Sequence, residues 1–79
     1  MTKHVVVTGA NKGIGLNLCK QYSAKGYRVT AVVRTPSEEL QALDVKIISD
    51  IDVSNADDVA TLANYLHGEK IDILVNNAG

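Results

Sequence analysis

The sequence predicts an α/β fold, a partial doubly wound parallel sheet with helices on both faces. Short runs rich in valine and isoleucine alternate with helical patterns along the whole chain of 79 residues. A glycine-rich turn follows the first apolar run directly and opens the first helical stretch. Since helices that join parallel strands make right-handed crossovers, we expect the strand order 3-2-1-4 within one domain.

The predicted strands are short, and they are rich in β-branched residues. They span residues 5–8, 28–33, 45–49 and 71–75. Only Asp72 interrupts the apolar run of the last strand, and such a run is typical of a parallel strand that is buried on both faces.

The first helix is predicted over residues 14–24, with Ile14, Leu18 and Tyr22 on one face. Gly26 then ends this helix in a left-handed conformation, which glycine adopts without steric cost.

Two further helices follow the second and third strands. The pattern Thr35-Pro36-Ser37-Glu38 predicts a short helix with Thr35 as its N-cap and Glu38 as the acid of a capping box. The last helix begins at Ser54 or Asn55 and ends at Gly68. Its apolar residues recur at helical spacing, and they are Val59, Leu62, Ala63 and Leu66.

The glycine turn predicts a phosphate-binding site. Its spacing is G-x-x-x-G-x-G, formed by Gly9, Gly13 and Gly15. Gly9 lets the chain turn off the strand, Gly13 lets the backbone approach a ligand, and Gly15 lets the helix pack close to the sheet. The free N–H groups and the positive dipole end of the first helical turn favour a diphosphate there.

A second motif, Asn76-Asn77-Ala78-Gly79, follows the fourth predicted strand. With both motifs present, the chain resembles the N-terminal part of a short-chain dehydrogenase/reductase, whose signature pairs T-G-x-x-x-G-x-G with N-N-A-G. The version Asn11-Lys12-Gly13-Ile14-Gly15 is similar to the carbonyl-reductase-like branch. The resemblance runs the whole length of the chain.

This resemblance implies that residues 1–79 are the N-terminal part of an NAD(P)-binding Rossmann domain, without the catalytic half. The activity implied is hydride transfer between NADP(H) and a small-molecule carbonyl or alcohol. In the family, a catalytic serine and a Tyr-x-x-x-Lys pair follow the N-N-A-G strand. None of the three tyrosines has a lysine four residues later, so we identify no catalytic residue and expect the chain alone to be inactive.

Arg34, at the end of the second strand, favours NADP(H) over NAD(H). NAD-binding enzymes usually place an acidic residue there, which would repel a 2′-phosphate, whereas an arginine offers it a fork of donors. Lys12 can add a second cation, and basic residues at both positions accompany the same preference in the family. Both side chains could instead be ordinary solvated cations.

The resemblance also implies contacts to the adenosine half of the cofactor. Asp52 would accept from the adenine amino group and Val53 would meet the ring, with Asp50 as a competing candidate. One of Asn76 and Asn77 would brace the central strands, and the other would lie near the ribose. Asn11 could lie beside the ribose and phosphate or stabilise the turn itself. The predicted cofactor-binding residues are Gly9, Asn11, Lys12, Gly13, Ile14, Arg34, Asp52, Val53, Asn76, Asn77, Ala78 and Gly79.

Composition narrows the choice of partners. Eight basic and nine acidic residues give a net charge of −1, so we expect neither nucleic acid nor a membrane as a partner. The single cysteine, Cys19, can form neither a disulfide framework nor a metal site, which favours the cytoplasm. We expect both histidines, His4 and His67, at the surface. The bare edge of the fourth strand leaves homo-oligomer formation open.

Two other functions fit the same motifs. A non-catalytic nucleotide-binding sensor or interaction module would need no catalytic tyrosine. A Rossmann-like methyltransferase with a sulfonium cofactor is a third class, but Arg34 and Lys12 would then meet no 2′-phosphate.

Overall fold

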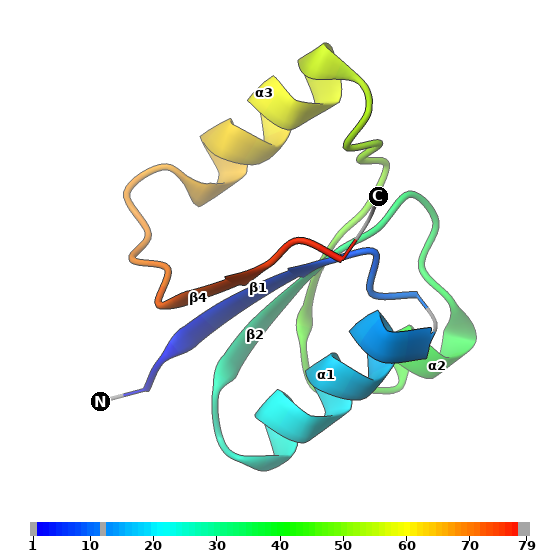
Figure 1. Ribbon diagram of the computed structural model, residues 1–79, viewed down its shortest axis with the longest axis vertical. Helices are drawn as coiled ribbons and strands as arrows, with labels where there is room; N and C mark the ends of the chain where they lie inside the picture. Colours follow the sequence, from blue (N-terminus) through cyan, green and yellow to red (C-terminus); the bar gives the residue numbers. More distant parts are fainter. Residues whose placement is uncertain (1, 12, 78–79) are drawn as a thin grey trace.

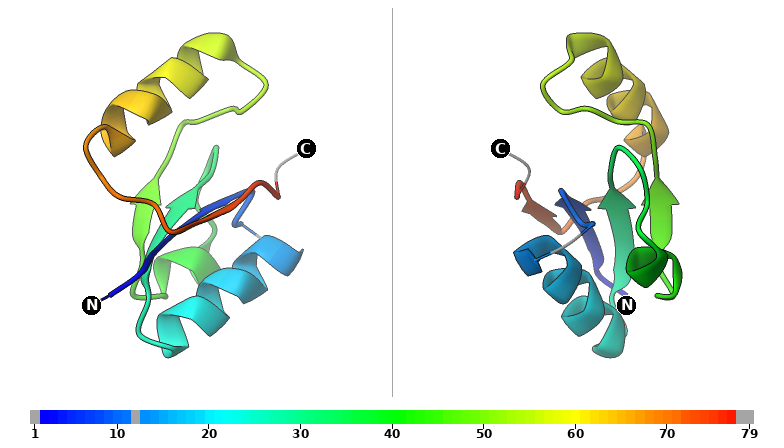
Figure 2. Two further views of the ribbon diagram at one scale, coloured as in Figure 1. Left: turned by 60° about the vertical axis from the view of Figure 1, so that its left-hand side comes forward. Right: turned by 90° about the vertical axis from the view of Figure 1, so that its right-hand side faces the viewer.

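The computed structural model describes residues 2–11 and 13–77, and it confirms the predicted parallel sheet with the order β3-β2-β1-β4. The strands are β1 (His4–Thr8), β2 (Arg28–Val32), β3 (Lys46–Ile48) and β4 (Ile73–Val75). The helices are α1 (Gly13–Ala24), α2 (Glu38–Gln41) and α3 (Ala56–Leu66). Helices α1 and α2 cover one face of the sheet and α3 lies over the other (Figures 1 and 2).

Strand β1 is the centre of the sheet, and all five of its residues are buried. It pairs with β2 from His4 to Thr8 and with β4 from Val5 to Val7. The main core lies on the face covered by α1 and α2, where Val5 and Val7 meet Leu16, Cys19 and Leu40. Burial raises the pKa of the Cys19 thiol, as expected for a cysteine that packs as a small apolar side chain.

The buried face of α1 differs from the predicted one. Ile14 is 71% exposed, and the buried residues of this helix are Gly15, Leu16 and Cys19. Leu18 and Tyr22 are half-buried, and Tyr22 packs against the main core, so the prediction was wrong for Ile14. Gly15 lies against Gly9 at the end of β1, and this contact sets the rotation of the helix. Gly26 has a φ of 84°, so the predicted left-handed ending is confirmed.

The N-cap of α2 is Ser37, and the prediction of Thr35 was wrong. The Ser37 hydroxyl accepts a hydrogen bond from the Leu40 N–H group, with 3.2 Å between oxygen and nitrogen. Asn55 is the N-cap of α3, which is one of the two predicted positions.

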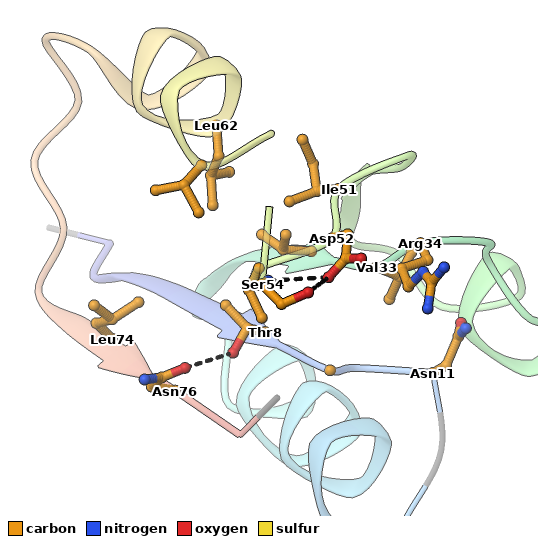
Figure 3. Close-up of a pocket in the computed structure, with 14 residues that line it drawn as sticks. Thr8, Asn11, Val33, Arg34, Ile51, Asp52, Ser54, Leu62, Leu74 and Asn76 are labelled. Carbon is orange, nitrogen blue, oxygen red and sulfur yellow. Dashed lines mark hydrogen bonds between the residues drawn. The ribbon is translucent and has the colours of Figure 1, made fainter. Parts of the chain in front are cut away.

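The face under α3 is less tightly packed than the opposite face. Val6, Val32, Ile48 and Ile51 form a second buried cluster, and the half-buried Leu62 and Leu66 of α3 pack against it. No described residue of α3 is buried, and a cavity lies between this helix and the sheet (Figure 3). Two residues of the predicted apolar stripe, Leu62 and Leu66, therefore contact the sheet side, whereas Val59 and Ala63 are exposed.

Strand β4 lies at one edge of the described sheet, and it is only partly buried. Leu74 in its middle is 63% exposed, so the prediction of a fully buried strand was wrong. The reason is that Leu74 lines the cavity that separates α3 from the sheet. Among the described residues, no helix is long and apolar enough to cross a membrane.

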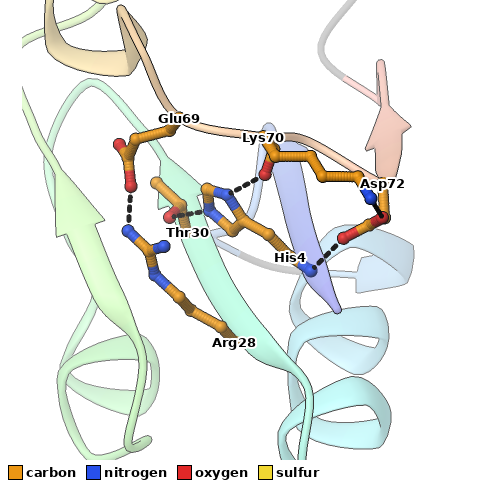
Figure 4. Close-up of polar contacts among 6 residues, drawn as sticks. All are labelled: His4, Arg28, Thr30, Glu69, Lys70 and Asp72. Atoms are coloured by element: carbon orange, nitrogen blue, oxygen red, sulfur yellow. Dashed lines mark hydrogen bonds and ion pairs between the residues drawn. The ribbon is translucent and has the colours of Figure 1, made fainter. Parts of the chain in front are cut away.

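His4 is buried, with 3% of its surface exposed, so its predicted place at the surface was wrong. Its Nδ1 lies 3.1 Å from the Lys70 carbonyl oxygen, and its Nε2 lies 2.7 Å from the Thr30 hydroxyl (Figure 4). A carbonyl oxygen only accepts, so Nδ1 donates to Lys70, and Nε2 forms a hydrogen bond with the Thr30 hydroxyl. The ring thus joins β1 and β2 to the segment that precedes β4. His67 is exposed, as predicted.

Asp72 ties the start of β4 to β1 next to this ring (Figure 4). Its Oδ2 accepts from the His4 backbone N–H at 2.8 Å, and its own N–H donates to the His4 carbonyl at 2.9 Å. The hydrogen bond from His4 lowers the pKa of Asp72, and the charges of Lys70 and Lys3 lower it further. The ionised carboxylate is therefore the form that stabilises the fold.

This shift predicts a dependence of stability on pH. A lowered pKa in the folded state contributes stability above the pKa of the unfolded chain, near pH 4, and loses it as pH falls through the folded value. We expect Asp72→Asn to lower the free energy of unfolding at pH 7. The difference in this free energy between wild type and the variant should become smaller below about pH 4. Urea unfolding across this range measures the difference, with Asp44→Asn as the exposed control. A difference that is constant with pH would contradict the assignment.

Candidate functional site

A cavity of about 840 Å³ opens at the carboxyl ends of the strands, under α3 (Figure 3). This is the edge where the strand order reverses, with β2 on one side of β1 and β4 on the other. Open parallel sheets bind their ligands at such an edge. The lining residues come from the ends of β1 and β2, from the loops after β1, β2 and β3, from β4 and its exit, and from α3. They are Thr8, Gly9, Asn11, Val32, Val33, Arg34, Ile51, Asp52, Val53, Ser54, Val59, Leu62, Leu74 and Asn76.

The cavity brings together half of the residues that the sequence predicts to bind a cofactor. These are Gly9, Asn11, Arg34, Asp52, Val53 and Asn76. Gly13 and Ile14 begin α1 and Asn77 follows Asn76, but these three residues do not line the cavity. Lys12, Ala78 and Gly79 lie outside the described residues.

The glycine turn has the backbone conformation that its spacing predicts. Gly9 and Gly13 have φ angles of 63° and 60°, in the left-handed region that favours glycine. A Cβ on Gly13 would meet no described atom within 4 Å, and the next residue, Ile14, is exposed. The first N–H groups of α1 have no acceptor within the helix, so this open end suits an anion.

Gly15 allows the closest contact between the helix and the sheet. A Cβ built on Gly15 would lie 2.4 Å from the Gly9 carbonyl oxygen and 2.8 Å from Asn77 Nδ2. Asn77 Nδ2 in turn donates to the Gly9 carbonyl at 3.1 Å. The turn, the helix and the exit from β4 therefore meet at one point, where there is no room for a side chain.

The two asparagines after β4 differ in their contacts, which the sequence could not resolve. Asn77 braces the turn through Gly9, and its backbone N–H donates to the Thr8 hydroxyl at 3.0 Å. Asn76 lines the cavity, and its Oδ1 lies 3.3 Å from the Thr8 hydroxyl (Figure 3). Thr8 thus joins both residues to the end of β1, a role that the sequence analysis did not assign.

Asp52 lies at the cavity, whereas the competing Asp50 does not line it. The Asp52 carboxylate accepts from the Ser54 hydroxyl at 2.6 Å and from the Ser54 N–H at 2.9 Å. The hydroxyl bond and then the N–H bond lower the pKa of Asp52, and the charge of Arg34 acts in the same direction. Asp52 is therefore an ionised acceptor at the cavity wall.

Arg34 brings a positive charge to the same part of the cavity wall as Asp52 (Figure 3). Its backbone is fixed, because the Arg34 carbonyl accepts from the Asp50 N–H at 2.9 Å. Asp50 has a φ of 62°, which turns the chain back toward Arg34. Within residues 2–11 and 13–77, no ion pair or hydrogen bond engages the guanidinium group. Its donors are available to a ligand.

The comparisons with known proteins agree with this geometry. Residues 3–79 match the family model of the short chain dehydrogenases. The chain belongs to this family. It is 33% identical to (+)-neomenthol dehydrogenase of Arabidopsis thaliana and 37% identical to (−)-isopiperitenone reductase of Mentha piperita. Each alignment covers 98% of the chain, but only 30% and 29% of those relatives.

Solved structures of the family have the same fold. A short-chain dehydrogenase from Streptomyces avermitilis superposes with a TM-score of 0.86 at 31% identity, over 100% of this chain and 31% of that one. A 4-hydroxyisoleucine dehydrogenase complexed with NADH gives 0.83 at 32% identity, over 99% and 34%. The chain thus spans about a third of the length of these family members.

The contact at Gly15 predicts an unusual response to alanine. Glycine to alanine inside a helix normally stabilises by about 1 kcal/mol. At Gly15 we expect a loss of about 1–3 kcal/mol, because the new methyl group would overlap backbone and amide atoms. Thermal or urea unfolding measures the change, with Asn17→Ala on the exposed face of the same helix as the control. A stabilised Gly15→Ala protein would refute the close contact.

Proposed function

We propose that residues 1–79 form the cofactor-binding part of an oxidoreductase that transfers hydride between NADP(H) and a carbonyl or alcohol substrate. The observation that carries the proposal is the meeting of the glycine turn and Arg34 at one cavity on the carboxyl edge of the sheet. Membership of the short-chain dehydrogenase family supports the reaction class. The reductases among its relatives support a carbonyl substrate.

The described residues fit a dinucleotide. The open first turn of α1 offers N–H donors to the diphosphate, and Gly13 leaves the approach free of a side chain. Asp52 offers an ionised acceptor for the adenine amino group, and Asn76 offers a polar group for the ribose. When bound, the nicotinamide supplies the hydride, and these residues bind and orient it.

Arg34 supports NADP(H) as the preferred cofactor. The guanidinium is exposed at the cavity, and it is not neutralised by a described carboxylate within ion-pair distance. A 2′-phosphate would accept charge-assisted hydrogen bonds from it, whereas the hydroxyl of NAD(H) would gain less. The neighbour with bound NADH shows that the same fold also serves the other cofactor, so the choice rests on local side chains.

The proposal includes the cellular compartment and the partner of the protein. One buried cysteine suits a reducing compartment, and we place the protein in the cytoplasm. Its partner is a small-molecule substrate.

Replacing Arg34 tests the cofactor preference. We expect wild type to bind NADPH more tightly than NADH and Arg34→Asp to reverse this order, because a carboxylate repels the 2′-phosphate. Each charge-assisted bond lost is worth roughly 1.5–3 kcal/mol when desolvated, and less when wet. Fluorescence titration with both dinucleotides measures the ratio. Lys25→Asp, which makes the same charge change at the far end of α1, is the control. Equal affinities in wild type would argue against the proposal.

A second test concerns turnover. Purified residues 1–79 should bind NADPH without reducing a carbonyl substrate, because general acid catalysis needs a positioned proton donor. Tyr22, Tyr27 and Tyr65 are followed four residues later by Gly26, Ala31 and Glu69, so none has the family's lysine. The assay follows NADPH consumption with a panel of aldehydes and ketones, with light scattering to record the oligomeric state. Turnover by a monodisperse monomer would show that the active site lies within these residues.

A further inference from the structure

The Asn11 side chain is bound at both ends to the loop that carries Arg34. Its Oδ1 accepts from the Ser37 backbone N–H at 2.8 Å, and its Nδ2 donates to the Thr35 carbonyl. The backbone carbonyl of Asn11 also accepts from the Ser37 hydroxyl at 3.0 Å. One residue of the glycine turn thus makes three hydrogen bonds to the segment directly after Arg34.

This connection is anchored in the core. The Ser37 hydroxyl that donates to Asn11 also caps α2 by accepting from the Leu40 N–H, and the Leu40 side chain is fully buried. On its other side, the Arg34 carbonyl is held by the Asp50 N–H. The backbone at Arg34 is therefore fixed from two directions, although its side chain is exposed.

Loss of the Asn11 hydrogen bonds would remove one of these two supports and leave the bond between Asp50 and Arg34 in place. The loop after β2 would then sample more positions, and a ligand that uses Arg34 would have to restrict them again on binding. A ligand that does not use Arg34 would avoid this cost. The two dinucleotides differ in this respect, because only NADPH carries a 2′-phosphate for the guanidinium.

We propose that Asn11 is a positioning residue for cofactor selectivity, which holds the Arg34 loop against the glycine turn. The inference rests on the proposed function, and it assigns Asn11 a role through Arg34 and not a direct contact with the dinucleotide. A direct contact would involve the ribose or diphosphate, which NADPH and NADH share. The two roles therefore predict different changes in selectivity.

A double-mutant cycle separates the two roles. Affinities for NADPH and NADH are measured for wild type, Asn11→Ala, Arg34→Ala and the double variant, with Asn17→Ala as the matched control. We expect Asn11→Ala to reduce the preference for NADPH about 3- to 10-fold, as for one or two lost neutral hydrogen bonds. NADH affinity should change less than about twofold. In the Arg34→Ala background, Asn11→Ala should leave the preference unchanged.

A second variant and a measurement without ligand keep the test decisive even if Asn11→Ala folds poorly. Ser37→Ala removes a contact to the Asn11 carbonyl without changing a residue that lines the cavity, and it should shift selectivity in the same direction. Without cofactor, amide hydrogen exchange at Ser37 should be faster in Asn11→Ala than in Asn17→Ala, since its acceptor is gone.

The outcomes distinguish this inference from the proposed function. Equal weakening of NADPH and NADH in Asn11→Ala, or an unchanged preference, would overturn the positioning role while the NADPH preference of wild type stands. Additive effects of Asn11→Ala and Arg34→Ala would overturn it as well. If wild type binds neither dinucleotide, the proposed function fails and the inference falls with it.

Discussion

The close contact between Gly15 and the end of β1 is the constraint on which the arrangement of the site depends. The Gly9 carbonyl and the Asn77 amide occupy the space where a side chain on residue 15 would lie. This contact sets the rotation of α1, so that Leu16 and Cys19 point into the core while Ile14 is exposed. It also brings the open end of α1 to the edge where β1 and β4 end. The absence of a side chain at Gly15 thus determines both the packing of α1 and the position of its open end.

The two faces of the sheet serve different purposes. The face under α1 and α2 contains the main core, and residues from both helices are fully buried there. The face under α3 has a smaller cluster and a cavity of about 840 Å³. A densely packed face gives rigid strand ends, and an open face leaves room for a ligand beside them. The bonds of His4 and Asp72 close the opposite edge, where β4 meets β1.

Periodicity and turn chemistry predicted the strand order, the helices and the glycine turn, because these depend on local patterns and on the handedness of crossovers. The sequence failed where a residue's surroundings come from distant segments. His4 is buried because Thr30 and Lys70 satisfy its ring nitrogens, and neither partner is near it in sequence. Leu74 is exposed because burial of a strand depends on what covers it, which an apolar run does not specify. Ser37 replaces Thr35 as a helix cap because Asn11, 26 residues earlier, binds it.

The same distinction applies to the candidate site. Motif spacing predicted the conformation of the turn proposed to bind the diphosphate, since the glycine turn and the helix terminus are contiguous in the chain. The proposed contacts to the adenosine half involve charges from separate loops, with Arg34 after β2 and Asp52 after β3 on the same cavity wall. In the proposed function, a cation at the end of β2 favours NADP(H) but does not determine the preference alone. The strength of this preference depends on how firmly the loops are joined. An exposed arginine on a mobile backbone loses conformational entropy when it binds a ligand, and this loss offsets much of the free energy that its hydrogen bonds contribute.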